Sequence, residues 1–111
     1  MGDIKIVGME KLQKKLKQNV RMDDVKKVVR HNGAEMQTKA MQNAPVDTGT
    51  LKRSIGLEMT DGGLTAEVIP AAEYAPYVEL GTRFMEAQPY LKPAFDEQKE
   101  IFKKDMKKLV E

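Results

Sequence analysis

Residues 44–55 constrain the fold of this chain more than any other stretch of it. They read Ala-Pro-Val-Asp-Thr-Gly-Thr-Leu-Lys-Arg-Ser-Ile. Pro45 has no amide hydrogen and its ring clashes with the preceding turn, so a helix arriving from the amino-terminal side must end near Asn43. Leu51 and Ile55 are apolar and are expected to anchor the strand that follows in the core. The stretch therefore predicts a joint between a long helix and a strand.

The triplet Asp47-Thr48-Gly49 within this stretch has two interpretations. In the first it is the catalytic loop of a dimeric aspartic protease, in which each chain supplies one Asp to a dyad that shares a proton. That fold is nearly all β, whereas here the triplet follows an amphipathic helix. In the second, Asp47 or Thr48 caps a short turn and Gly49 permits a close backbone approach. The second interpretation is favoured, and the protease is kept as an alternative.

The spacing of apolar residues predicts the remaining secondary structure. The first expected elements are a short strand at 3–7, a helix with the stripe Met9, Leu12, Leu16 and Val20, and a helix that Asp23 or Asp24 caps. Strands at 54–59 and 64–69 follow, on either side of the turn Asp61-Gly62-Gly63. The last elements are one or two helical turns at 74–80 and a final helix that Pro93 opens. The two strands form a β-hairpin. The predicted fold class is α+β, with three helices packed on a small, mainly antiparallel sheet in one domain spanning residues 1–111.

Apolar stripes on the two longer predicted helices indicate the core. The expected core faces consist of Val25, Val28, Val29, Asn32, Met36 and Ala40 on one helix and of Phe95, Phe102, Met106 and Leu109 on the other. A chain of 111 residues is long enough to bury them. Residues 82–92 lack such a period and are expected to form an ordered loop or an extended arm.

Composition excludes several classes of function. The chain has no Cys and one His, so thiolate sites, disulfides and most imidazole metal clusters are excluded. No apolar run approaches the roughly 18 residues of a membrane span, and nothing at the amino terminus resembles a signal peptide. Phosphate-binding loops and nucleophile elbows are also absent. We therefore expect an intracellular protein that is not an enzyme, with no cofactor and no metal.

Two acidic side chains and the single histidine are further candidates for functional groups. Glu73 and Glu79 could form a carboxylate pair, but Glu79 is expected instead to pair with an Arg or to accept hydrogen bonds from backbone amides. His31 projects to one side of the apolar stripe of its helix and is expected to be an ordinary surface residue.

Three motifs occur in order along the chain and together resemble one protein family. They are Ala44–Ile55, the tyrosine block Tyr74–Thr82 (Tyr-Ala-Pro-Tyr-Val-Glu-Leu-Gly-Thr) and Met85–Ala94 (Met-Glu-Ala-Gln-Pro-Tyr-Leu-Lys-Pro-Ala). Residues 6–12 also resemble that family's strand-to-helix start. The chain is identified by these motifs as similar to the small tail-component family of long-tailed bacteriophages, the neck or tail-completion group that includes proteins similar to the lambda minor tail protein Z. Tyr90 stands where Phe is commoner, and Pro76 is a departure inside the tyrosine block.

The resemblance implies a structural virion protein of the head–tail junction, which acts in tail completion and head–tail joining by assembly. It implies a homo-oligomeric ring, expected to be a hexamer, with neighbouring neck or tail proteins as partners and neither a membrane nor a small-molecule substrate. The expected location is the virion, and the host cytoplasm during assembly. Whether the source is an active phage or a prophage is left open.

Three sets of residues follow as candidate sites. The structural motif consists of Pro45, Asp47, Thr48, Gly49, Leu51, Tyr77, Glu79, Gly81 and Thr82. The candidate subunit interface within 82–92 consists of Phe84, Met85, Pro89 and Tyr90; the alternative is a loop folded back on its own core. The candidate DNA-facing residues are Lys11, Lys14 and Arg21.

The DNA hypothesis depends on an uneven distribution of charge. Residues 1–30 hold nine Lys or Arg against four Asp or Glu, and residues 31–91 hold four against eight. Basic groups that line a ring lumen would attract DNA phosphates without regard to sequence, and a small basic nucleic-acid-binding module is the weaker variant of this idea. The alternative is a set of solvated helix faces.

Overall fold

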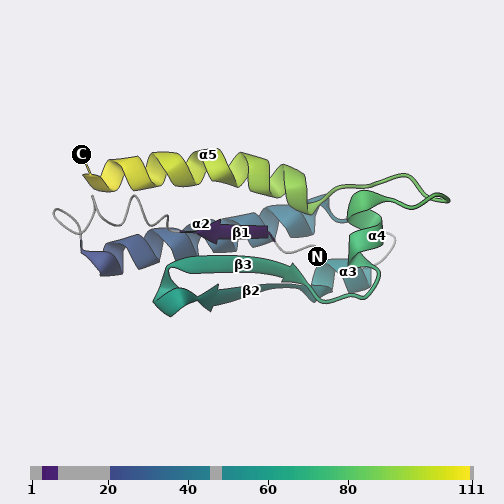
Figure 1. The fold of residues 1–111 in the computed structure, drawn as a ribbon, viewed down its shortest axis with the longest axis horizontal. Coiled ribbons are helices and arrows are strands. Elements are labelled where there is room, and N and C mark those ends of the chain that lie inside the picture. Colours follow the sequence, from purple (N-terminus) through teal and green to yellow (C-terminus); the bar gives the residue numbers. More distant parts are fainter. Residues whose placement is uncertain (1–3, 8–20, 46–48, 111) are drawn as a thin grey trace.

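The computed structural model describes residues 4–7, 21–45 and 49–110 (Figure 1). Its elements are β1 (Ile4–Val7), α2 (Met22–Asn43), α3 (Gly49–Ser54), β2 (Ile55–Thr60), the 3₁₀ turn η1 (Asp61–Gly63), β3 (Thr65–Pro70), α4 (Ala75–Leu80) and α5 (Leu91–Val110). The α+β class is confirmed. The predicted count of three helices is wrong, because the described residues alone contain four. The helix predicted around residues 9–20 lies outside the described residues.

The additional helix, α3, lies where the sequence predicted only a capped turn. Residues 49–54 wind into six helical residues directly before β2 begins at Ile55. Leu51 is the residue of α3 that is fully buried, as predicted, but it is buried from a helix. A turn and a short helix share the same capping chemistry, so the residue types around Asp47 could not separate them.

The three strands form an antiparallel sheet in the order β1-β3-β2. The predicted hairpin of β2 and β3 is confirmed, with each strand one residue later than expected. Its turn uses positive φ angles at Asp61, Gly62 and Gly63, and the Thr65 hydroxyl donates a hydrogen bond of 2.6 Å to the Asp61 carboxylate. The strand β2, which carries the exposed charge of Glu58 near its centre, is one edge of the sheet.

The helix α2 packs against the sheet and ends at Asn43, as the position of Pro45 predicts. It crosses the strands at Gly33, where an added Cβ would lie 2.6 Å from the Cβ of Ala66 and 3.0 Å from Leu57. Any side chain at position 33 would therefore force the helix away from the sheet. Five of the six predicted core residues of α2 are buried, and Val28 is half-buried.

The amino-terminal cap of α2 differs from the prediction. The helix begins at Met22, so the cap position falls on Arg21, whose side chain makes no capping hydrogen bond. Asp23 and Asp24 lie inside the first turn instead, where a negative charge still favours the helix dipole.

The helix α5 runs antiparallel to α2 along its length (Figure 1). Phe102 and Met106 are buried in the shared core, as predicted. The helix begins at Leu91, two residues before the predicted start at Pro93, and proline is tolerated there because first-turn amides need no intrahelical acceptor.

Buried polar side chains connect α2 to α5. The Gln98 amide donates to the Asn32 carbonyl oxygen at 2.6 Å and to the Glu35 carboxylate at 3.0 Å, and it accepts from the Lys39 ammonium at 2.7 Å. Asn32 in turn donates to the Asp105 carboxylate at 3.0 Å. Asn32 and Gln98 are both fully buried. These buried groups find their hydrogen-bond partners in one relative register of α2 and α5, so the network specifies how the two helices pack.

Candidate subunit interface

Two of the three sequence motifs that carry the family resemblance lie at the same end of the molecule. Figure 1 shows α3 and α4, which belong to the first and second motif, at the end of the molecule from which a loop extends. The Ala71 amide bonds the Ser54 carbonyl at 3.0 Å and joins the two segments at the base of the hairpin. Asp47 and Thr48 lie outside the described residues. Among the described residues, the atoms nearest to a Cβ added at Gly49 belong to the flexible Arg53 guanidinium, the closest at 2.8 Å.

Glu79 clamps the loop between α4 and α5. Its Oε1 atom accepts the amide hydrogens of Tyr90 at 3.0 Å and Leu91 at 2.8 Å, and its Oε2 atom accepts that of Lys92 at 3.1 Å. These three amides open α5, and the next residue, Pro93, has no amide hydrogen to satisfy. One carboxylate therefore caps the whole amino terminus of α5 from a different helix. The prediction that Glu79 bonds backbone amides is confirmed.

Tyr90 fixes the carboxyl end of the same loop in the core. Its side chain is fully buried, its hydroxyl donates to the Ala75 carbonyl at 3.4 Å, and its own carbonyl accepts from the Asn43 amide at 3.4 Å. Burial, the Glu79 carboxylate and Tyr74 together raise the pKa of Tyr90 to about 12. Tyr90 therefore anchors the loop to the core of its own chain.

A tight hairpin projects between these two anchors. Thr82 and Met85 exchange backbone hydrogen bonds of 2.8 and 3.3 Å, and the Gln88 amide bonds the Val78 carbonyl at 2.8 Å. Gly81 has a φ of 76°, and an added Cβ would lie 2.7 Å from the backbone nitrogen of Ala87. Only glycine allows the chain to leave α4 at this angle. The loop is thus held by its own backbone at several points.

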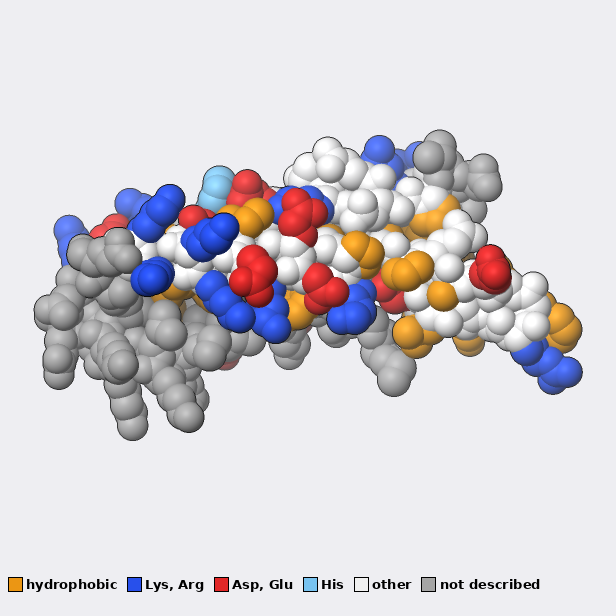
Figure 2. Space-filling model, turned by 90° about the horizontal axis from the view of Figure 1, so that it is seen from above, with side chains coloured by type: hydrophobic (Ala, Val, Ile, Leu, Met, Phe, Trp, Pro, Cys, Tyr) orange, Lys and Arg blue, Asp and Glu red, His pale blue; other side chains and the backbone are white. Residues whose placement is uncertain are grey.

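The projecting loop and α4 carry a cluster of exposed apolar side chains, which we call the tip. The tip consists of Tyr77, Leu80, Phe84 and Met85, which are 59%, 66%, 87% and 38% exposed. The large exposed hydrophobic side chains of the described residues all belong to it. Figure 2 shows hydrophobic side chains gathered toward this end of the molecule. Such a cluster on a rigid support is typical of a contact surface.

The structure separates the four predicted interface residues. Phe84, Met85 and Pro89 are exposed, whereas Tyr90 is buried in its own subunit. Leu80 was not predicted as part of the surface, and the only sequence signal for it is that a six-residue helix cannot bury all of its apolar side chains. The Arg83 guanidinium stacks over the Phe84 ring, 5.0 Å from its centroid, and holds that ring at the end of the hairpin.

The predicted DNA-facing residues are described only in part. Lys11 and Lys14 lie outside the described residues. Arg21 is exposed and its guanidinium lies 4.0 Å from the Asp23 carboxylate. Residues 21–31 and 101–110, which lie together because α2 and α5 are antiparallel, hold eight Lys or Arg against three Asp. One end of the molecule is thus basic and the other carries the tip.

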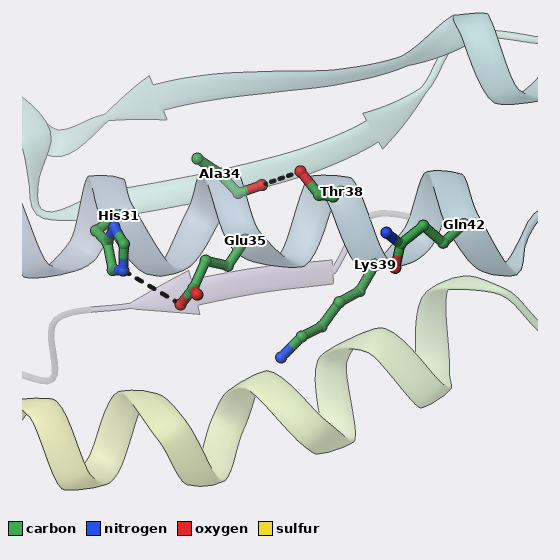
Figure 3. Close-up of a pocket in the computed structure, with 6 residues that line it drawn as sticks. All are labelled: His31, Ala34, Glu35, Thr38, Lys39 and Gln42. Carbon is green, nitrogen blue, oxygen red and sulfur yellow. Dashed lines mark hydrogen bonds and ion pairs between the residues drawn. The ribbon is translucent and has the colours of Figure 1, made fainter.

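A shallow hollow on α2 is separate from the tip (Figure 3). It is lined only by α2 residues, among them His31, Glu35 and Lys39. These side chains already have partners: His31 lies 3.4 Å from Glu35, and Lys39 reaches toward α5, where its ammonium lies 3.3 Å from Glu97. The side chain of His31 is exposed, as predicted.

The described residues form an α+β fold that presents exposed apolar side chains on a rigid support. Residues 8–81 match the model of the family described as "Bacteriophage HK97-gp10, putative tail-component". The match covers two thirds of the sequence, and the chain belongs to this HK97-gp10-like family of phage tail components. No curated protein and no solved structure matches the chain.

The alternative functions receive little support from the described residues. The block that contains Asp47 connects two helices of an α+β fold, whereas the protease alternative requires a nearly all-β fold. Within the described residues no three His, Cys, Asp or Glu side chains are grouped to hold a metal ion. No described helix is long and apolar enough to cross a membrane.

Proposed function

We propose that this protein completes the phage tail and joins it to the DNA-filled head, and that it acts by assembly and not by catalysis. The observation that carries the proposal is the tip: apolar side chains held in the open by the Glu79 clamp, Tyr90 and Gly81. An enzyme cleft would enclose such groups, whereas an assembly surface exposes them until the partner arrives.

The dimensions of the tip suit the centre of an interface. An aromatic side chain buries about 150–250 Å², so the four tip residues supply several hundred of the roughly 800 Å² that a stable partner contributes. Charged side chains beside the tip, Arg83 and Glu86, would form its polar rim. Because the loop is already ordered, little conformational entropy is lost on binding.

The proposed assembly is a homo-oligomeric ring, with six subunits as the expected number, that contacts neighbouring neck or tail proteins. Subunits in a ring meet through two different surfaces. A molecule 52 Å long and about 20 Å across with unlike ends provides such surfaces. The proposed location is the head–tail junction of the virion.

A phage that lacks the gene tests the proposal. Electron microscopy is expected to show full-length tails beside unjoined, filled heads, and normal infectious particles would contradict the proposal. Complementation with the wild-type gene should restore joining, and Phe84→Asp should not. Lys99→Asp, an exposed change on α5 away from the tip, is the matched control and should complement.

Contact with packaged DNA is a second candidate function, and the basic end of the molecule favours it. Arg21 lies at that end, and we propose that Lys11 and Lys14 join it in facing DNA phosphates. Binding to duplex DNA should then weaken steeply with salt. Charge reversal of Arg21 should lower the salt dependence, and absence of binding at low salt would contradict the proposal.

A further inference from the structure

The strand β2 is an edge of the sheet whose outer side pairs with no described strand. Its pairing with β3 runs without a bulge from Ile55 to Thr60, and it contains no proline. Bulges, prolines and inward charges are the usual protections of an edge strand. The protection that β2 does carry is one exposed charge, Glu58.

The free backbone groups of β2 can be assigned from the hydrogen-bond pattern. The Ala71 amide bonds the Ser54 carbonyl, so residues of the same parity, such as Glu58, direct their backbone groups to β3. The backbone groups of Leu57 and Met59 then point to the free edge. Gln37 supports this assignment, because its amide donates to the outward carbonyl of Ile55 at 2.9 Å. An incoming strand would find the groups of two successive outward residues ready to pair.

The other edge strand of the sheet, β1, has a matching sequence. Its first three residues are Ile4-Lys5-Ile6, and the middle of β2 reads Leu57-Glu58-Met59. Both segments are apolar, charged, apolar, and the two charges are opposite. Register places Lys5 and Glu58 on either side of Glu67 in one row across the sheet.

That row has a like-charge pair at its β2 end. Glu58 stands directly opposite Glu67, an arrangement that is unfavourable across strands. A strand added beside β2 with a lysine opposite Glu58 would place an opposite charge next to that exposed carboxylate. Its flanking apolar residues would extend the helix-facing side of the sheet, where Leu57 lies against Gly33.

We propose that β2 of one copy pairs, in parallel, with β1 of a second copy, with Lys5 of that copy opposite Glu58. The contact joins two different edges, so it is head-to-tail and can close a ring. The inference rests on the proposed assembly function and specifies one of its interfaces. It leaves the tip free for another virion protein.

Disulfide trapping tests the pairing directly, because the chain contains no cysteine. Within one copy, positions 5 and 58 are separated by β3, about 10 Å apart, which exceeds the roughly 7 Å that a disulfide can bridge. The double variant Lys5→Cys/Glu58→Cys should therefore give an intermolecular ladder on oxidation that collapses on reduction. Lys5→Cys/Glu67→Cys is the positive control, since register predicts a bridge within one copy.

Two controls decide between interfaces. A ladder no stronger than that of the single-cysteine variants, or strong dimers from Glu58→Cys alone, would overturn the edge pairing. Amine cross-linking of the wild-type protein distinguishes a failure of the edge pairing from a failure of the proposed assembly function. Cross-linked oligomers without a cysteine ladder refute the edge pairing and leave the assembly function standing, whereas absence of self-association in both assays refutes both.

Charge exchange supplies a second readout. Glu58→Lys should reduce the oligomer fraction several-fold at low salt, and Lys5→Glu/Glu58→Lys should restore it. Because Glu58 is exposed, the single variant is expected to fold normally. Equal oligomer fractions for the wild type and Glu58→Lys would overturn the proposal.

Discussion

The α2–α5 contact and the tip distribute polar and apolar groups in opposite ways. Between the helices, Asn32 and Gln98 are fully buried and hydrogen-bonded to each other. At the tip, Phe84 is almost fully exposed although its backbone is held in place. Buried and hydrogen-bonded polar groups specify one packing of the two helices, whereas exposed apolar groups on a rigid support are typical of a contact surface.

The two regions also differ in how a substitution should act. A change in the α2–α5 contact alters the free energy of unfolding, because the buried groups lose partners that water cannot replace. A change at the tip is expected to alter the free energy of the proposed assembly, because its side chains are exposed and touch little of the rest of the chain. Four predictions, in order of decreasing effect on stability, test this division.

Asn32→Leu should cause the largest loss of stability. The substitution leaves the buried Gln98 amide without one acceptor and the Asp105 carboxylate without a donor. We expect a loss of about 2–4 kcal/mol in the free energy of unfolding, measured by chemical denaturation. Thr38→Ala, an exposed change on the same helix, is the control and should cost under about 0.5 kcal/mol. Adding Gln98→Leu should recover part of the loss, and no loss in the single variant would contradict a specifying role for the network.

Glu79→Ala should cost about 2 kcal/mol, because three amide hydrogens at the start of α5 lose their acceptor. Hydrogen exchange should show faster exchange at the Tyr90, Leu91 and Lys92 amides. Glu73→Ala is the matched control, since Glu73 is exposed in the same segment. Unchanged exchange at those three amides would show that the loop does not depend on the clamp.

Tyr90 predicts a loss of stability at alkaline pH. Its pKa is about 12 in the folded chain and 10.0 without the surrounding structure. The folded state therefore holds the phenolic proton more tightly, so the contribution is complete below pH 10 and is lost as the pH rises toward 12. Between pH 9 and 11 we expect about 1 kcal/mol of additional destabilisation in the wild type relative to Tyr90→Phe. Stability profiles that run parallel with pH for the two proteins would contradict this prediction. Absorbance at 295 nm should show that one of the three tyrosines ionises at a higher pH than the others.

Much of this fold could be predicted from residues whose chemistry acts locally. Pro45 ended α2, the glycines of the 61–63 turn set the hairpin, and Glu79 was expected to bond backbone amides. The hydrogen bonds around Gln98 could not be predicted, because they join residues 59 to 66 positions apart. Asn32 was expected on the core face of its helix, but nothing in the sequence indicated which side chain it would bond. Tyr90 was assigned to the surface for a similar reason: only the three-dimensional return of the loop to Ala75 and Asn43 shows that it is buried.

Phe84→Ala should have the smallest effect on stability and the largest on assembly. The ring is 87% exposed, and its contact within the subunit is the Arg83 guanidinium. We therefore expect a change below about 0.5 kcal/mol in the free energy of unfolding. The affinity for the tail or head partner, measured by co-sedimentation, should fall at least tenfold because a central aromatic anchor is removed. A lowered melting temperature with unchanged assembly would instead show that the loop folds back to stabilise its own subunit. Tyr90→Ala is the contrasting control. The Tyr90 side chain is fully buried, so its removal should destabilise the loop and the core together.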